Sequence, residues 1–384
     1  LLDWGISAHM GFSMFASLGA MIDVDFADLI DFLCEDPHTR NIMLYIEGGI
    51  GDVKQFINAA RGCARNKPII VLKPAVPVKE KVHGLTHTGL LVDTEQVYDA
   101  VFRRTGVVRV AGAVDLFDAA SVLYAKHLPK GPKLLTITNA GGIGIMATNT
   151  LLEFGGELVK LSAETIEELR RILPSHWKSD FYLDILRDAD VERFIATLNI
   201  CLKDPGVDGV LIIFTPQGAA APDELAEAVS CVAKTAWLPI VAAWMGGRDV
   251  QKGKEILLQN CIPTYDTPEE VVKTYLYMYN YRRNIALLYE TPEELLGDNT
   301  HPNKNLKVFI RRAADRGLTV LTEAESMRFL TNYGIPFLKI QTAHSVEEAV
   351  QFAAEVGYPV VLKVSSPDII FRIDVGGVVT GINS

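Results

Sequence analysis

Short apolar runs alternate with amphipathic segments along most of the chain, and glycine or proline marks the turns between them. The apolar runs are Asn41–Ile46, Ile69–Lys73, Val107–Val110, Leu134–Thr138, Gly209–Thr215 and Pro239–Trp244. The amphipathic segments that we expect to be helical lie near Val53–Ala64, Asp115–Lys126, Gly144–Phe154, Pro222–Lys234 and Val250–Leu258. Because continuous apolar strands that alternate with helices are typical of parallel sheets covered on both faces, we expect an α/β fold. Two flavodoxin-like, doubly wound units fit this pattern, and they divide near the proline-rich turn at 129–132.

The last third of the chain has a different organisation. A long helix is expected over Tyr265–Tyr289, and the polar stretch Gly297–Asn305 is typical of a linker. A new unit then begins, with helices expected at Thr322–Tyr333 and Ser345–Val356 and a strand at Tyr358–Val364. The expected domains are therefore 1–128, 129–265, a helix and linker at 266–316, and a third unit at 317–384.

Charge and composition exclude some classes of partner. The 384 residues carry a formal net charge of −10 and no basic run, which argues against nucleic-acid binding. No apolar run reaches the roughly 18 residues needed to cross a bilayer, so we expect no membrane partner. The five cysteines are widely spread and form no C-x-x-C pair, which is typical of an intracellular protein, and we expect a cytoplasmic one. The first and last residues each fall within an expected element, so we expect a fragment of a longer protein.

His87 is the strongest candidate for a reactive side chain. It lies among small residues, with Gly84 and Thr86 before it and Thr88 and Gly89 after it, and these supply little apolar surface to bury a ring. A structural or solvent-exposed histidine is the simpler interpretation of any single histidine. A glycine-containing loop nevertheless allows a nucleophilic imidazole to move between partners, so the pattern favours a phosphorylated histidine.

A carboxylate and a glycine-rich turn are the expected partners of this histidine. Glu47 follows an apolar strand and precedes two glycines, so it is either a solvated strand-end carboxylate or the group that orients one nitrogen of His87. The turn that carries Asn139, Gly141 and Gly142 connects a strand to a helix. Such turns are common and often serve only tight packing, but their backbone amides can also bind a phosphoryl group at a helix N-terminus.

Lys363 interrupts an apolar strand in the third unit. A lysine in such a strand is unfavourable unless its ammonium has a partner, and a nucleotide phosphate would serve as one. A lysine at the sheet edge that extends into solvent is an equally good interpretation.

In combination, the motifs of the chain resemble the ADP-forming acyl-CoA synthetase family of the fused single-chain type, which is related to succinyl-CoA synthetase. The motifs that resemble its CoA-ligase portion are Gly11–Ser13, Ser17–Gly19, Asp36–Thr39, Tyr45–Gly48, Lys67–Ile69, His87–Gly89 and Asn139–Gly142. Those that resemble the start of its ATP-grasp portion are Leu321–Glu323, Tyr333–Pro336, Gly357–Val360 and Asp374–Val378. The resemblance implies two CoA-ligase domains followed by the beginning of an ATP-grasp domain.

The resemblance also implies a reaction. Carboxylate, CoA and ATP would exchange reversibly with acyl-CoA, ADP and phosphate, and Mg²⁺ would accompany the nucleotide. His87 matches the histidine that carries the phosphoryl group, Glu47 the glutamate that supports it, and Lys363 an ATP-binding lysine. The expected partners are a small carboxylic acid or its acyl-CoA and, as is usual in the family, further copies of the chain.

Two departures from the family pattern leave alternatives open. Phe371 stands where the family usually has a histidine, and Phe181–Asp184 replaces the sequence Asn-Pro-x-Asp. A non-catalytic module of a protein lysine acetyltransferase that senses acyl-CoA or nucleotide would suit the first change. A ligase that activates an acid for a later lyase step is a third possibility.

Overall fold

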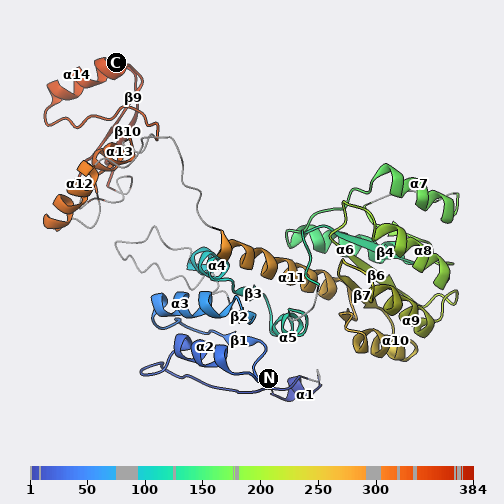
Figure 1. Cartoon of the computed structure of the whole chain (residues 1–384). Coiled ribbons are helices and arrows are strands. Elements are labelled where there is room, and N and C mark those ends of the chain that lie inside the picture. Colours follow the sequence, from blue (N-terminus) through green and yellow to red (C-terminus); the bar gives the residue numbers. More distant parts are fainter. Residues whose placement is uncertain are drawn as a thin grey trace. The chain divides into compact units, whose positions relative to one another are not determined.

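The computed structural model describes residues 2–7, 10–74, 94–123, 127–175, 177, 181–290, 304–317, 321–331, 335–366, 369, 373 and 375–384. These residues form two compact units, which are considered separately (Figure 1). The first unit contains the elements from α1 (Leu2–Ser7) to α11 (Pro268–Tyr289), and the second contains those that follow.

The first unit begins with a parallel three-stranded sheet in the order β1-β2-β3. Its strands are β1 (Ile42–Tyr45), β2 (Ile69–Leu72) and β3 (Val108–Val110), and its helices are α2 (Phe26–Glu35), α3 (Val53–Cys63), α4 (Thr94–Thr105) and α5 (Ala113–Val122). Successive residues of β2 enter opposite cores: Ile69 and Val71 pack with α2, α3 and α4, whereas Ile70 and Leu72 pack with α5. This burial on both faces explains why β2 is apolar throughout.

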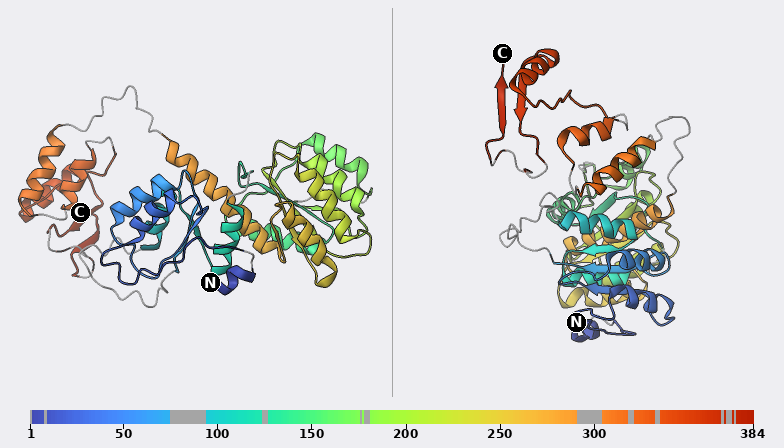
Figure 2. Two further views of the ribbon diagram at one scale, coloured as in Figure 1. Left: turned by 60° about the horizontal axis from the view of Figure 1, so that its bottom comes forward. Right: turned by 90° about the vertical axis from the view of Figure 1, so that its left-hand side faces the viewer.

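A second parallel sheet of five strands follows, in the order β5-β4-β6-β7-β8. Its strands are β4 (Leu134–Thr138), β5 (Leu183–Asp184), β6 (Gly209–Phe214), β7 (Ile240–Trp244) and β8 (Thr264–Tyr265). Its helices are α6 (Gly141–Glu153), α7 (Ala163–Ile172), α8 (Val191–Cys201), α9 (Pro222–Ala233) and α10 (Arg248–Gln259). Helices α7 to α10 cover one face, and α6 covers the other together with α11 (Figure 2).

Helix α11 contributes side chains to the cores of both sheets. Its Tyr275 is fully buried against β4 and β6, and the Tyr275 hydroxyl donates to the carbonyl oxygen of Gly131 at 3.0 Å. Further along, Tyr277 packs in the core of the three-stranded sheet, and Asn284 Nδ2 donates to the carbonyl oxygen of Val107 at 3.0 Å. The helix therefore connects the two sheets through buried contacts.

The second unit contains α12 (Lys304–Asp315), α13 (Glu323–Thr331), α14 (Val346–Val356) and the antiparallel pair β9 (Val360–Lys363) and β10 (Val378–Ile382). The expected fold class is confirmed by these elements. Among the described residues, no helix combines the length and the apolar character that a membrane-spanning segment requires.

Two helices, α6 and α11, begin three residues away from their expected starts. Helix α6 begins at Gly141, three residues earlier than expected, so the glycine-rich turn itself forms the first turn of the helix. Helix α11 begins at Pro268 because Thr267 and Glu270 form a capping box, and Tyr265 belongs to β8 instead.

Candidate functional site

Glu47 lies just beyond the carboxyl end of β1. The backbone N–H of Ile46 still donates to the carbonyl oxygen of Leu72 at 3.0 Å, so the pairing with β2 continues up to the residue before Glu47. The Glu47 side chain is exposed and lines a cavity together with Gly48, Gly49 and the segment 10–21. The carboxylate is thus located at a sheet edge where parallel α/β folds commonly bind ligands.

Lys73 follows β2 at the same edge, and it is a buried cation that the sequence did not single out. The residue is 7% exposed, and its Nζ donates to the carbonyl oxygen of Gly48 at 3.1 Å. The same ammonium lies 4.5 Å from the centre of the Tyr98 ring. One signal was present in the sequence, because Lys73 directly follows a strand made only of apolar residues.

His87 lies outside the described residues, and so does Phe371. The predicted contact between Glu47 and His87 therefore stays a prediction. The structure describes the chain up to residue 74, and it places Lys73, directly after β2, beside the loop that carries Glu47 and Gly48.

The predicted phosphate-binding turn lies at the carboxyl end of β4. Asn139 is buried, and its side-chain amide is bound to the neighbouring strand end: Nδ2 donates to the carbonyl oxygen of Thr215 at 2.8 Å. In return, the N–H and the hydroxyl of Thr215 donate to Asn139 Oδ1 at 3.0 and 3.1 Å. The side chain of Asn139 therefore joins β4 to the end of β6.

The first turn of α6 has no side-chain cap, because Ala140 occupies the N-cap position. A β-carbon at Gly142 would meet open space, whereas one at Gly141 would overlap the carboxylate of Asp184. A β-carbon at Gly144 would overlap the ring of Tyr182. The first turn of α6 is thus open at Gly142. Gly141 lies beside the carboxylate of Asp184, a neighbour that was not predicted from the sequence.

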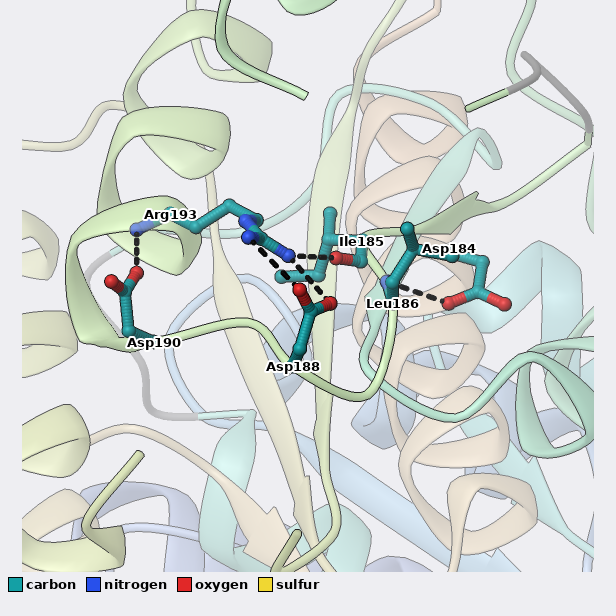
Figure 3. Close-up of polar contacts among 6 residues, drawn as sticks. All are labelled: Asp184, Ile185, Leu186, Asp188, Asp190 and Arg193. Atoms are coloured by element: carbon teal, nitrogen blue, oxygen red, sulfur yellow. Dashed lines mark hydrogen bonds and ion pairs between the residues drawn. The ribbon is translucent and has the colours of Figure 1, made fainter. Parts of the chain in front are cut away.

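Asp184 is held in this position by the loop that follows β5 (Figure 3). Its Oδ1 accepts a hydrogen bond from the N–H of Leu186 at 2.9 Å. Arg193 on α8 donates to the carbonyl oxygen of Ile185 at 3.2 Å and pairs with Asp188 at 2.9 Å (Figure 3). The loop that follows Asp184 is therefore fixed by an ion pair and by hydrogen bonds that involve the backbone.

Lys363 is the last residue of β9 in the second unit. Its side chain is 41% exposed, and its Nζ pairs with Glu323 Oε1 at 2.7 Å. The burial that motivated the nucleotide prediction is therefore not found in this unit. Within the described ranges, no group of three or more His, Cys, Asp or Glu residues could hold a metal ion.

Three family models match the chain in succession. A succinyl-CoA ligase like flavodoxin domain matches residues 1–123, a Ligase-CoA domain matches 134–289, and an ATP-grasp domain matches 312–384. The two parallel-sheet portions thus match domains that are named for CoA ligases, and the last part of the chain matches an ATP-grasp domain.

Relatives indicate the family. The chain is 35% identical to acetate–CoA ligase (ADP-forming) I of Archaeoglobus fulgidus over 98% of its own length and 53% of the relative. It is 29% identical to 4-hydroxybutyrate–CoA ligase (ADP-forming) of Nitrosopumilus maritimus over 98% of its length and 54% of the relative. The chain thus resembles ADP-forming acyl-CoA ligases over almost its whole length, and it spans about half the length of these two curated relatives.

A solved structure supports the same assignment. The dinucleotide-forming acetyl-coenzyme A synthetase 1 of Candidatus Korarchaeum cryptofilum, in complex with phosphate and ADP, superposes with a TM-score of 0.62 at 26% identity. The superposition covers 74% of this chain and 62% of that one. The acetyltransferase-module and lyase-coupled alternatives gain no support from these relatives.

Proposed function

We propose that the protein is a reversible ADP-forming acyl-CoA synthetase in which His87 carries the phosphoryl group between an acyl phosphate and the nucleotide. The observation that carries the proposal is the similarity to ADP-forming ligases over 98% of the chain. A phosphoramidate transfers its phosphoryl group readily in both directions, so two separate sites can share one group.

Glu47 serves this step from the end of β1. Its carboxylate accepts a hydrogen bond from one ring nitrogen of His87, which leaves the other nitrogen free to attack phosphorus. The location of Glu47 at the carboxyl edge of a parallel sheet supports this role, because its side chain is exposed and lines a cavity there.

The first turn of α6 receives the phosphoryl oxygens in this proposal. The uncapped amides of Gly141 and Gly142 act as donors, and the positive end of the helix dipole favours the anion. Asn139 shapes the turn through its hydrogen bonds to Thr215, so its contribution is to hold the backbone in place.

The nucleotide belongs to the ATP-grasp portion, where Lys363 contacts a phosphate after leaving Glu323. CoA and a small carboxylic acid complete the set of substrates, and copies of the chain assemble with one another. The described residues do not provide a cluster suited to Mg²⁺, so no step is assigned to the ion.

The proposal predicts that the full-length protein forms acyl-CoA and ADP from CoA, Mg-ATP and a carboxylic acid. A panel that begins with acetate and 4-hydroxybutyrate should identify at least one acid that is consumed. Because the phosphoryl carrier is lost, His87→Asn should lower the rate by at least about 10³-fold. Products are measured by chromatography. Formation of AMP instead of ADP, or a variant as active as the wild type, would overturn the proposal.

A further inference from the structure

Lys73 is an unusual residue because its charge is buried without an acidic partner in the described part of the chain. The residue is 7% exposed, and no carboxylate among the described residues lies within ion-pair distance of its ammonium. Its two described contacts are the Gly48 carbonyl oxygen at 3.1 Å and the face of Tyr98 at 4.5 Å. Burial of an ammonium is unfavourable, and a methionine would pack against Tyr98 without that cost. Stability alone therefore does not explain a charge at this position.

The Gly48 carbonyl belongs to a loop whose two adjacent glycines lie in open surroundings. A β-carbon at Gly48 or at Gly49 would find no atom within 4 Å, so neither residue lies in close packing. Both residues are exposed, as is Glu47 before them. The hydrogen bond from Lys73 thus restrains a peptide group one residue after the Glu47 carboxylate.

Lys73 is itself held from two sides. Its carbonyl oxygen accepts a hydrogen bond from Arg109 at 2.8 Å, and Arg109 pairs with Asp99 at 2.8 Å. Tyr98 stacks on Phe102 with ring centres 5.9 Å apart. The ammonium is therefore presented to the Gly48 carbonyl from a fixed backbone and over a fixed ring.

We infer that Lys73 is a positioning residue for the proposed phosphoryl transfer, and that its ammonium fixes the Gly48 carbonyl and, through it, the position of the Glu47 carboxylate one residue earlier. This inference rests on the proposed function. Glu47 and Lys73 follow the neighbouring parallel strands β1 and β2, and one hydrogen bond links the two segments just beyond these strands. A group that acts only through Glu47 has no effect once the Glu47 carboxylate is gone, and this property separates positioning from general stabilisation.

A double-mutant cycle tests the inference. The full-length protein is incubated with γ-³²P-labelled Mg-ATP, and the rate of acid-labile, base-stable labelling is measured for the wild type, Lys73→Met, Glu47→Gln and the double variant. Lys54→Met, which removes an exposed lysine from α3, is the matched control and should label at the wild-type rate. We expect Lys73→Met to slow labelling by about 10- to 100-fold and Glu47→Gln by about 100-fold.

The double variant decides between the two roles. Positioning through Glu47 predicts that it labels about as slowly as Glu47→Gln alone, with an unchanged apparent KM for ATP. Additive losses of about 10³- to 10⁴-fold, or a Lys73→Met variant that labels like the wild type, would overturn the inference.

Two further outcomes are distinguishable. If the wild type takes no label, the proposed function fails, and the inference fails with it. If Lys73→Met does not fold, Lys73→Arg replaces it in the cycle, because a planar guanidinium does not reproduce the ammonium contact. That variant should slow labelling at least about threefold, again without effect in the Glu47→Gln background; labelling at the wild-type rate would contradict the inference.

Discussion

Asp118 on α5 illustrates how packing between elements sets the ionisation of one residue. Burial raises the pKa of the Asp118 carboxyl from its ordinary value of 3.8 to about 7, and the nearby carboxylates of Glu270 and Asp115 add to the effect. Glu270 lies on α11, so the perturbation arises where α5 and α11 pack together. Between about pH 4 and pH 7, the Asp118 carboxyl is therefore protonated in the folded protein and ionised in the unfolded chain.

The sign of this shift predicts how stability depends on pH. The contribution of Asp118 is complete below about pH 4 and is lost as the pH rises to about 7. Because the carboxyl is only partly buried, we expect a loss of about 1–2 kcal/mol in the free energy of unfolding, well below the full linkage value. Urea unfolding at pH 5.0 and 7.5 measures the change, and Asp118→Asn should remove it. An Asp118→Asn variant with the pH dependence of the wild type would contradict the assignment.

Single residues could be predicted from sequence where a local pattern was enough. Glu47 was placed at a strand end because the apolar run before it is short and is followed by glycines. Lys73 was not identified, because its burial depends on the Gly48 loop and on the Tyr98 ring. The position of Asp184 beside Gly141 depends on the pairing of β5 with β4, two strands about 45 residues apart in the chain.

At the scale of the element, α6 is shaped by glycines that differ in their surroundings. Gly144 lies under the ring of Tyr182, and a β-carbon there would approach Cγ of the ring at 3.0 Å, whereas Gly142 faces open space. Packing therefore requires a glycine at position 144 but not at position 142.

This difference predicts opposite effects for two alanine substitutions in one helix. Gly142→Ala should be neutral or stabilise the protein by up to about 1 kcal/mol, because alanine loses less conformational entropy in a helix. Gly144→Ala should destabilise it by about 1–3 kcal/mol, because the ring of Tyr182 has to move. Chemical denaturation of the two variants measures both changes. Equal stability of the pair would show that Tyr182 does not pack on α6.

The sequence predicted most elements but not all of their ends. The apolar runs predicted the central strands of both sheets, because both faces of each strand are buried and the pattern is strong. The start of α6 was misplaced because its N-cap is Ala140, which gives no capping signal in sequence. The strands β5 and β8 have two residues each, too few to form a recognisable pattern.

At the scale of the molecule, the sequence predicted two parallel-sheet units but not how they are connected. Helix α11 was expected as one long helix. The structure shows that Tyr275 packs in the core of the five-stranded sheet, whereas Tyr277 packs in the core of the three-stranded sheet. A row of aromatic residues on a helix does not reveal that its members belong to different cores, because that depends on the path of the chain between the sheets.

The central claim is that one imidazole carries the phosphoryl group, and the most direct test is to locate that group. The full-length protein is treated with Mg-ATP, digested at alkaline pH and sequenced by tandem mass spectrometry. We expect a single phosphorylated histidine at His87. After Mg-ATP has been removed, we expect it to disappear when a carboxylic acid that the enzyme uses and CoA are added together. Phosphate on another residue, or a phosphohistidine at His87 that persists with both substrates present, would contradict the account.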